Sequence, residues 1–201
     1  MIAVVINRAG FSKELAAKLA EARNPQAMLL AVGRELANQL KAHFRMKEQT
    51  QPNKLSPRRE HFWLQIAGLV NNPEQTGYNA VSVRVSDPRI AQKVFGGTIT
   101  AKRAGALTIP VSEQAYGRMA STFERETGLK LFLLKKKDGG GNGVLVAKVG
   151  DQVVVEYVLR KSVDQKADPT ALPERSMLEK ALFARAQSVV DRQDVTGGLD
   201  H

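Results

Sequence analysis

The side chains best suited to acid–base or metal chemistry are few in this sequence and lie far apart. The histidines are His43, His61 and His201, and none belongs to a His-Glu-x-x-His motif or stands at metal-ligand spacing from a carboxylate pair. The absence of cysteine excludes thiolate catalysis, disulfides and cysteine-ligated metal centres. We interpret His43 and His61 as helix-surface or interface residues, and we expect no bound metal and no cofactor.

Motifs of nucleophilic and acid–base catalysis are missing as well. No serine stands in a Gly-x-Ser-x-Gly motif. Glu124 and Glu126 lie two residues apart in a predicted helix, which puts their carboxylates on different faces. With Arg118 and Arg125 nearby, these carboxylates are typical of solvated helix charges. The sequence therefore favours a protein that is not an enzyme, and the alternative of a small hydrolase has no set of residues behind it.

Residues 139–143 (GGGNG) invite comparison with a phosphate-binding loop. Such a loop follows a strand and is followed by Lys-Ser or Lys-Thr and by a helix whose N-terminus receives the phosphate. Here the next residues are Val144, Leu145 and Val146, which predict a strand. The glycine run is therefore predicted to form the tip of a β-hairpin.

The chain is strongly basic, with a net charge of +10 and a pI near 10.0. Lysine and arginine outnumber aspartate and glutamate by 11 to 5 in residues 1–70 and by 14 to 9 in residues 71–165, but not after that. The positive charge therefore belongs to a folded body and not to a tail. Such a balance favours an anionic partner, with nucleic acid first.

Two basic clusters fall in predicted turns. They are Lys102 with Arg103, and Lys135 with Lys136 and Lys137. Because no aromatic residues are interleaved with them, base stacking is not expected, and contact with DNA is expected to be non-specific and made to the phosphate backbone. The alternative interpretation is that both clusters are solvated turns.

The first third of the chain is predicted to be helical. Residues 11–23 are rich in helix formers, and Pro25 suits the first turn of a second helix that runs to about Met46. Five apolar residues recur along this helix at helical spacing: Leu29, Val32, Leu36, Leu40 and Phe44. A polar loop over residues 47–58 then leads to a shorter helix that carries Trp63 and ends at residues 71–73.

The later residues predict strands, with one helix inserted and one at the end. Val81, Val83 and Val85 alternate with polar residues, as in a half-buried strand. A helix over residues 113–127 is expected to end at Gly128, and a last helix spans about residues 174–193. Further strands are predicted over residues 94–100, 106–111, 129–134, 144–149 and 152–159.

This order predicts an α+β fold. Its centre is an antiparallel β-sheet meander in a sheet part of about residues 78–160, on which the N-terminal helices (about 11–70), the inserted helix and the C-terminal helix pack. With 201 residues, of which 43% are hydrophobic, we expect one domain over residues 1–201. The apolar run from Ile2 to Ile6 is too short for a signal peptide, and no stretch approaches the ~18 apolar residues of a membrane span, so we expect no membrane contact.

Residues 90–111 (IAQKVFGGTITAKRAGALTIPV) carry the most distinctive pattern of the chain. An aromatic residue and two glycines lead to Thr-Ile, a basic connection follows, and the stretch closes with Leu-Thr-Ile-Pro. This pattern resembles the tail-completion (virion morphogenesis) proteins of tailed bacteriophages, and residues 61–70, 114–118 and 160–173 resemble segments that flank it there. The matching residues are Phe95, Gly96, Gly97, Thr98, Ile99, Lys102, Ala106, Leu107, Thr108, Ile109 and Pro110.

The resemblance implies a structural subunit that joins the head and the tail of a phage through protein–protein contacts. Its implied partners are copies of itself in a ring, a hexamer in the virion, together with other neck or tail proteins. Assembly in the host cytoplasm and a final place in the virion are also implied. The insert between Pro110 and Leu129 and the glycine-rich tip depart from the simplest members, so a tail-completion, tail-terminator or connector position stays open.

The physical properties of the same stretch predict where such contacts form. Paired glycines in a strand allow a bulge or the close approach of another backbone, and Pro110 marks an edge strand or a strand end because it has no N–H to donate. We predict a bent two-stranded ribbon with Ile99, Leu107 and Ile109 on a core, which meets a neighbouring subunit along its edge. An ordinary hairpin within a monomer is the alternative. The predicted contact residues are Phe95, Gly96, Gly97, Thr98, Ile99, Leu107, Ile109 and Pro110.

Overall fold

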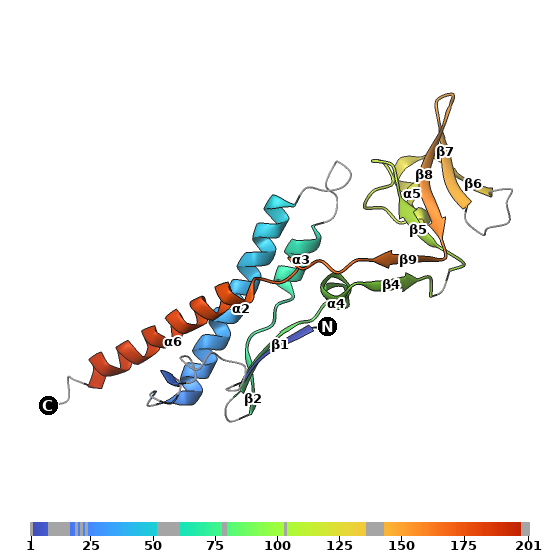
Figure 1. The fold of residues 1–201 in the computed structure, drawn as a ribbon. Helices are drawn as coiled ribbons and strands as arrows, with labels where there is room; N and C mark the ends of the chain where they lie inside the picture. Colours follow the sequence, from blue (N-terminus) through green and yellow to red (C-terminus); the bar gives the residue numbers. More distant parts are fainter. Residues whose placement is uncertain are drawn as a thin grey trace. The chain divides into compact units, whose positions relative to one another are not determined.

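The computed structural model describes most of the chain (Figure 1). For residues 2–7 and 193–197 the description covers the backbone alone. The described residues are 2–7, 17–18, 20, 22, 24–51, 61–77, 80–102, 104–135 and 143–197.

The chain divides into two compact units, and most of the second is inserted into the first. Unit 1 comprises residues 1–50, 62–95 and 167–201, and unit 2 comprises residues 51–61 and 96–166. Helices and antiparallel sheets occur in both, which confirms the predicted α+β class. The expectation of one domain over residues 1–201 stays a prediction.

Unit 1 is built around the long helix α2 (Pro25–Thr50). Asn24 caps its start, because the side-chain Oδ1 accepts a hydrogen bond from the N–H of Ala27 at 3.1 Å. Pro25 occupies the first helical position, where a missing N–H costs nothing. All five residues of the predicted apolar stripe are buried, at 2% exposure or less. The helix is therefore confirmed, and it continues beyond Met46 into residues that were expected to form a loop.

A three-stranded antiparallel sheet packs against α2. Its order is β1 (Ile2–Asn7), β3 (Ala80–Val85) and β2 (Glu74–Gly77), which makes β3 the central strand. The three valines of the predicted strand are fully buried in β3. Helix and strand approach closely at Gly33, where an added Cβ would lie 2.7 Å from the Cβ of Pro73 and 2.8 Å from Cγ2 of Val81. Glycine at this position allows the close packing.

Three further helices of unit 1 lie within the described residues after α2. The short helix α3 (Phe62–Gly68) buries Trp63 and Ile66, as the sequence predicts for this segment. Helix α4 (Pro88–Phe95) follows the break at Asp87-Pro88. The C-terminal helix α6 (Arg175–Gly197) is also confirmed and lies beside α2 (Figure 1), sharing its hydrophobic core.

Unit 2 contains a four-stranded antiparallel sheet in the order β5-β8-β7-β6. The meander that the sequence predicts is confirmed, and Gly150, with a φ of 61°, makes the turn between its last two strands. Its strands are β6 (Leu131–Lys135), β7 (Gly143–Val149) and β8 (Gln152–Arg160). Strand β5 (Leu107–Pro110) pairs with β8 and forms the other edge, so the prediction that Pro110 lies in an edge strand is confirmed as well.

The inserted helix α5 (Ala120–Thr127) covers one face of this sheet. Gly128 ends it in the left-handed conformation, with a φ of 74°, and its N–H bonds to the carbonyl oxygen of Glu124 at 2.9 Å, as predicted from the sequence. Phe123 packs edge to face on Tyr157, with ring centroids 5.7 Å apart. Burial raises the pKa of Tyr157, and the charge of the adjacent Glu156 adds to the shift.

A bulge in β8 turns Glu156 toward the same small core. The register between β7 and β8 shifts at this point, so Glu156 is left out of the strand pairing. Its buried carboxylate accepts a hydrogen bond from the hydroxyl of Ser112, and the hydroxyl of Tyr157 donates to the carbonyl oxygen of Arg118 at 3.2 Å. These bonds attach residues 111–119 to the sheet.

The predicted ribbon of residues 94–100 and 106–111 is wrong. Strand β4 (Gly97–Thr100) pairs with β9 (Ser162–Gln165) in a separate two-stranded sheet, whereas β5 pairs with β8. Gly96 and Gly97, with φ values of 69° and 119°, end α4 and begin β4, so they do not form a bulge within one strand. Each of the two strands pairs with a strand far along the chain. The turn residues at 102–105 suggested that the two strands pair with each other, and they contain no information about these distant partners.

Some elements were missed or cannot be compared. Strand β1 comes from the short apolar run after Met1, and β2 has four exposed residues without apolar alternation, so neither was predicted as a strand. Helix α4 was also missed, because its last residues were assigned to a strand. The predicted helix over residues 11–23 lies largely outside the described residues, as do residues 52–58 of the predicted loop.

A buried ammonium group joins the returning chain to α2. Lys47 is 4% exposed, and its Nζ lies 3.2 Å from Oδ2 of Asp168 and 2.8 Å and 2.6 Å from the carbonyl oxygen and Oγ1 of Thr170. The same Nζ is 4.7 Å from the centre of the Trp63 ring. The N–H of Asp168 donates to the carbonyl oxygen of Lys93 in α4 at 2.8 Å. We call these contacts the Lys47 clamp, and they hold the returning segment against three helices.

The clamp perturbs two ionisable groups. Burial opposes the charge of Asp168, but hydrogen bonds from Thr170 and Lys47 outweigh it and lower the pKa of the Asp168 carboxyl. His43 Nε2 lies 3.0 Å from the carbonyl oxygen of Thr170. Burial lowers the pKa of His43, and the charge of Lys47 adds to the shift, which together outweigh that hydrogen bond and the charge of Asp168.

Removing the carboxylate of the clamp should destabilise the protein. Asp168→Ala leaves the buried Lys47 ammonium without its counter-charge, which we expect to lower the free energy of unfolding by about 2–3 kcal/mol. Asp151→Ala is the matched control, since Asp151 is fully exposed and 3.9 Å from Lys148, and its loss should leave the unfolding midpoint unchanged. Urea unfolding curves measure both, and equal effects of the two substitutions would contradict the clamp.

The clamp also predicts a pH dependence. Because the folded pKa of His43 lies below the value of about 6.5 for an unperturbed histidine, the unfolded chain takes up the proton first. Stability is therefore highest above that pH and falls as the pH drops through and below it. In urea unfolding at pH 7.5 and pH 5.5, the wild type should lose more stability than His43→Gln; an equal loss would show that His43 does not contribute.

Candidate interaction surfaces

The residues predicted to form contacts fall in three different elements. Phe95 is the last residue of α4 and is 74% exposed. Gly96 joins it to β4, which contains Gly97, Thr98 and Ile99. The remaining contact residues lie in β5: Leu107, Ile109 and Pro110. The structure therefore does not place Ile99 on one apolar face with Leu107 and Ile109, because β4 and β5 belong to different sheets.

Strands β4 and β9 form a narrow ribbon without a core of its own. All four residues of β4 are exposed, including Ile99 at 37%, and no residue of β9 is fully buried. Ile99 lies opposite Val163, and the hydroxyl of Thr98 donates to Oδ1 of Asp164 at 2.5 Å. We call these eight residues the β4–β9 ribbon. Two-stranded sheets are marginally stable by themselves, so this ribbon gains most when another surface covers it.

Strand β5 is an edge that resists further pairing. The N–H of Val111 donates inward to the carbonyl oxygen of Glu156 at 2.9 Å. Because backbone groups alternate in direction along a strand, the nitrogen of the preceding Pro110 points outward, and it has no hydrogen to offer a neighbour. A proline in this position blocks the addition of a regular strand to β5.

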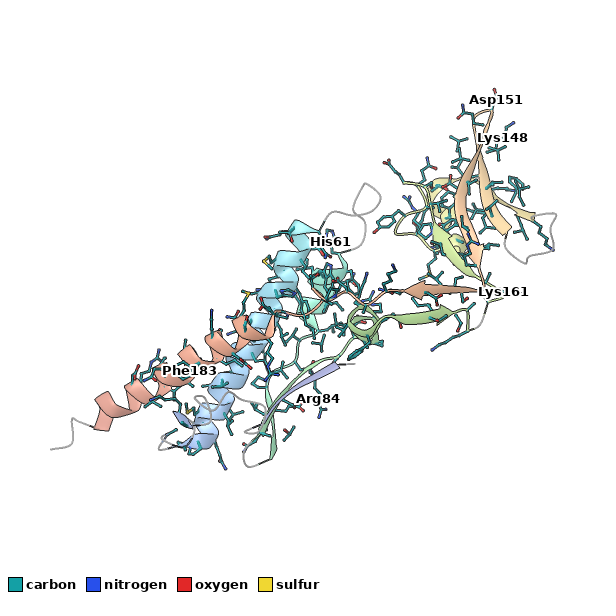
Figure 2. All side chains as sticks on the ribbon, in the orientation of Figure 1. His61, Arg84, Lys148, Asp151, Lys161 and Phe183 are labelled. Atoms are coloured by element: carbon teal, nitrogen blue, oxygen red, sulfur yellow. The ribbon has the colours of Figure 1, made fainter. Side chains whose placement is uncertain are left out.

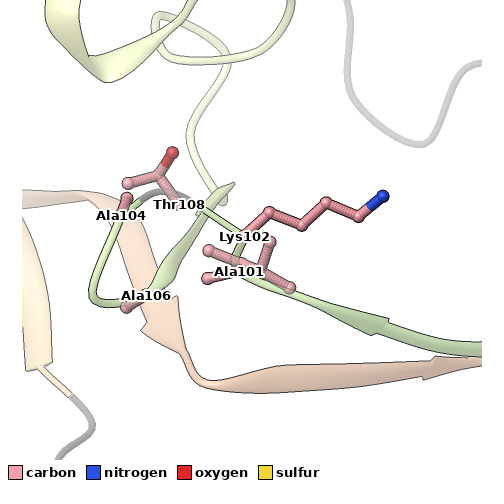
Figure 3. A pocket seen from close by; sticks show the side chains of 6 residues that line it. Ala101, Lys102, Ala104, Ala106 and Thr108 are labelled. Carbon is pink, nitrogen blue, oxygen red and sulfur yellow. The ribbon is translucent and has the colours of Figure 1, made fainter.

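The connection between β4 and β5 encloses a shallow cavity of about 580 Å³ (Figure 3). It is lined mostly by small side chains, with Lys102 and Thr108 as the polar groups. Neither group is a nucleophile with a base beside it among the lining residues, so the cavity has the shape of a docking recess and lacks the groups of a catalytic site. The lining residues are Ala101, Lys102, Ala104, Ala106, Leu107 and Thr108.

A basic cluster forms where the connection from β4 to β5 lies beside the turn from β8 to β9. The N–H of Ala101 bonds to the carbonyl oxygen of Lys161 at 3.4 Å, and Arg160 lies opposite Leu107 in the sheet. Lys102, Arg160 and Lys161 are all exposed, and we call them the basic corner; Figure 2 shows Lys161 at the turn between β8 and β9. The sequence reasoning singled out Lys102 and missed the other two, although Arg160 and Lys161 stand together at the end of the last predicted strand.

The other predicted basic residues are placed only in part. Lys135 is exposed at the end of β6. Arg103, Lys136 and Lys137 lie outside the described residues, as do residues 139–142 of the glycine run, whose last residue, Gly143, begins β7. Strand β7 does follow that run, as predicted, so the helix that a phosphate-binding loop requires is replaced by a strand.

Two ionisable side chains, those of His43 and Asp87, take part in hydrogen bonds within the fold. His43 takes part in the hydrogen bonding around Thr170, and His61 is exposed just before α3 (Figure 2). Asp87 is buried and bonds to the guanidinium of Arg89, and this hydrogen bond is the main reason why the pKa of Asp87 lies below its usual range. In the described part of the chain, no three side chains of histidine, aspartate or glutamate gather as metal ligands do. None of the described helices is long and apolar enough to cross a membrane.

The chain matches no protein-family model, no curated protein and no solved structure.

Proposed function

We propose that this chain is a structural subunit of a phage or prophage neck, of the tail-completion type, which joins head and tail through protein–protein contacts. The observation that carries the proposal is the β4–β9 ribbon, whose eight residues include none that is fully buried. An exposed strand pair of this kind presents backbone edges and the apolar side chain of Ile99 to a neighbour.

Two further features support an assembly role. The motif at residues 90–111, which resembles tail-completion proteins, coincides with the ribbon, the docking recess and the edge strand β5. Phe95 adds a large exposed aromatic side chain at the start of this stretch. The partners are copies of the chain in a ring, a hexamer in the virion, together with other neck or tail proteins, and assembly takes place in the host cytoplasm before the chain enters the virion.

Loss of the chain should stop virion assembly at a defined stage. In a phage whose gene for this chain carries a stop codon, we expect filled heads without joined tails in negative-stain images. The wild-type gene supplied in trans should restore joined particles. Ile99→Asp should fail to restore them, because it places a charge where the ribbon meets its neighbour.

The control is Thr100→Asp, which adds the same charge one residue further along β4 on the opposite face, and it should restore joined particles. Both variants should keep the wild-type unfolding midpoint, since both positions are exposed. Normal particles formed by Ile99→Asp would exclude the ribbon as the contact, and normal particles without the chain would exclude the function.

A non-specific nucleic-acid-binding protein is the second candidate, and the basic corner favours it. Three exposed cations lie at one end of the sheet, with Arg103 next to them in the sequence. Such a group lowers the free energy of binding to DNA by releasing counterions from the phosphates. The two candidates are compatible, because a neck ring surrounds the path of the DNA.

This candidate predicts a measurable salt dependence. The triple variant Lys102→Ala, Arg160→Ala, Lys161→Ala should weaken binding to random duplex DNA and reduce the slope of log affinity against log salt by up to about 2.7. A triple variant with the same loss of charge at other exposed positions (Arg45→Ala, Arg125→Ala, Lys180→Ala) should change the slope much less. No binding by the wild type at low salt would reject nucleic-acid binding.

A further inference from the structure

Strand β6 is an apolar edge strand in unit 2. Within the part of the chain that the structure describes, it pairs with β7 on one side and has no strand on the other. Three consecutive large apolar side chains in it are exposed: Phe132 at 54%, Leu133 at 48% and Leu134 at 51%. Edge strands of stable monomers are usually blunted by charges, prolines or bulges, and the middle of β6 has none of these.

Apolar side chains continue from β6 across one face of the sheet, where Val146 is buried at 4% exposure between two exposed neighbours. The register places Phe132 beside Val146 and Val155, and Lys148 beside Val153, on one face. Val153 is 65% exposed and Val155 is 40% exposed. We call Phe132, Leu134, Val153 and Val155 the open face of the sheet.

The opposite face and the opposite edge differ from this surface. On the opposite face α5 covers the central strands, where Phe123 packs with Tyr157 and Ala147, and Leu133 is the residue of β6 that stays exposed on that side. At the opposite edge, Pro110 blocks pairing to β5. The sheet is therefore protected on one face and along one edge, and it is exposed on the open face and along β6.

Positive charges border this surface. Among the described residues that the register assigns to the open face, the charged ones are Lys148 and Arg160. Lys130 and Lys135, both exposed, stand at the two ends of β6. One carboxylate also reaches this edge, since Oε1 of Glu124 accepts a hydrogen bond from the N–H of Leu131 at 2.7 Å, so the positive charge is balanced least at the Lys135 end. The carboxylate of Asp151 lies 3.9 Å from Lys148 at the hairpin tip (Figure 2), but both groups are highly exposed, so this pair neutralises little.

These charges and the backbone groups of β6 distinguish among three possible partners of this surface: a second copy of the chain, a lipid surface and an extended peptide. A second copy joined through antiparallel β6 strands would bring Lys130 of each copy close to Lys135 of the other, and the single carboxylate of Glu124 beside each pair would leave a net positive charge there, which is unfavourable. A lipid surface would leave the outward backbone groups of β6 without hydrogen-bond partners, apart from the N–H of Leu131, which bonds to Glu124. An extended peptide supplies those partners, and carboxylates at its ends complement the lysines.

We propose that β6 and the open face form a docking site for an extended segment of another protein, apolar in its centre and acidic at both ends, which adds to the sheet as a further strand. The site belongs to a different sheet from the β4–β9 ribbon, so this inference goes beyond the proposed function and does not depend on it.

The test uses the full chain and a synthetic, fluorescently labelled peptide of sequence EEVTVTVEE. We expect saturable binding by fluorescence anisotropy, weaker at high salt, with protection of the backbone amides of β6 in hydrogen exchange. The charge-reversed peptide KKVTVTVKK and the proline peptide EEVTPTVEE, which cannot complete a strand, should each bind at least about tenfold more weakly.

Two variants of the protein locate the site. Phe132→Glu should weaken binding of the acidic peptide by at least about tenfold, because it removes apolar contact area and repels the peptide. Met119→Glu makes the same change of charge at an exposed residue away from β6 and should leave affinity within about twofold. If Phe132→Glu does not fold, the double variant Lys130→Glu, Lys135→Glu serves instead and should prefer the charge-reversed peptide.

Several outcomes would overturn the proposal. Equal affinity for the acidic and charge-reversed peptides would show that the lysines do not select the peptide. Equal affinity for the acidic and proline peptides would show that the peptide does not add to the sheet as a strand. Self-association of the chain that Phe132→Glu abolishes identifies a second copy as the occupant. Binding to anionic vesicles that Phe132→Glu abolishes, without binding of the peptide, identifies a lipid surface.

Discussion

The buried ammonium of Lys47 is the interaction on which the arrangement of this chain depends. Unit 1 is assembled from segments that lie far apart in the sequence, because the chain leaves it after Phe95 and returns at Ala167. The Lys47 clamp fixes the return, with Asp168 and Thr170 as partners of the ammonium and Trp63 beneath it. Since the N–H of Asp168 also bonds to Lys93 in α4, the two ends of the insertion emerge close together. Strands β4 and β9 can then pair directly, from Gly97 with Gln165 onward.

Within unit 2, the four-stranded sheet and the β4–β9 ribbon differ in how they are covered. The four-stranded sheet buries one face under α5 and stabilises itself with the aromatic pair of Phe123 and Tyr157. The β4–β9 ribbon has no such cover, and the open face beside β6 has none either among the described residues. A fold that secures its core in this way and leaves a strand pair and one apolar sheet face exposed is suited to assembly with other chains.

The sequence predicts the fold well where local patterns decide it. The apolar stripe from Leu29 to Phe44 specifies α2, the glycines at 128 and 150 mark a helix end and a turn, and alternation specifies β3. The prediction from sequence fails where pairing between distant strands decides the fold. Strands β4 and β5 follow each other in the sequence, but β4 pairs with β9 and β5 pairs with β8, which lie on either side of Lys161. The paired glycines Gly96 and Gly97 lie at the end of a helix, and the local sequence does not distinguish this position from a bulge within a strand. The predicted contact residues lie on exposed elements, but they do not share one face. Arg160 and Lys161 lie near Lys102 because of strand pairing, which the sequence does not show.

The account rests on the chain being a component of an assembled particle, in contact with copies of itself through the β4–β9 ribbon. Quantitative mass spectrometry of purified tailed particles, after cross-linking with a lysine reagent, tests this most directly. We predict that the chain is present in a fixed small number of copies per particle, with cross-links from Lys161 or Lys102 to another copy or to a neck protein. Absence of the chain from mature particles would contradict the account.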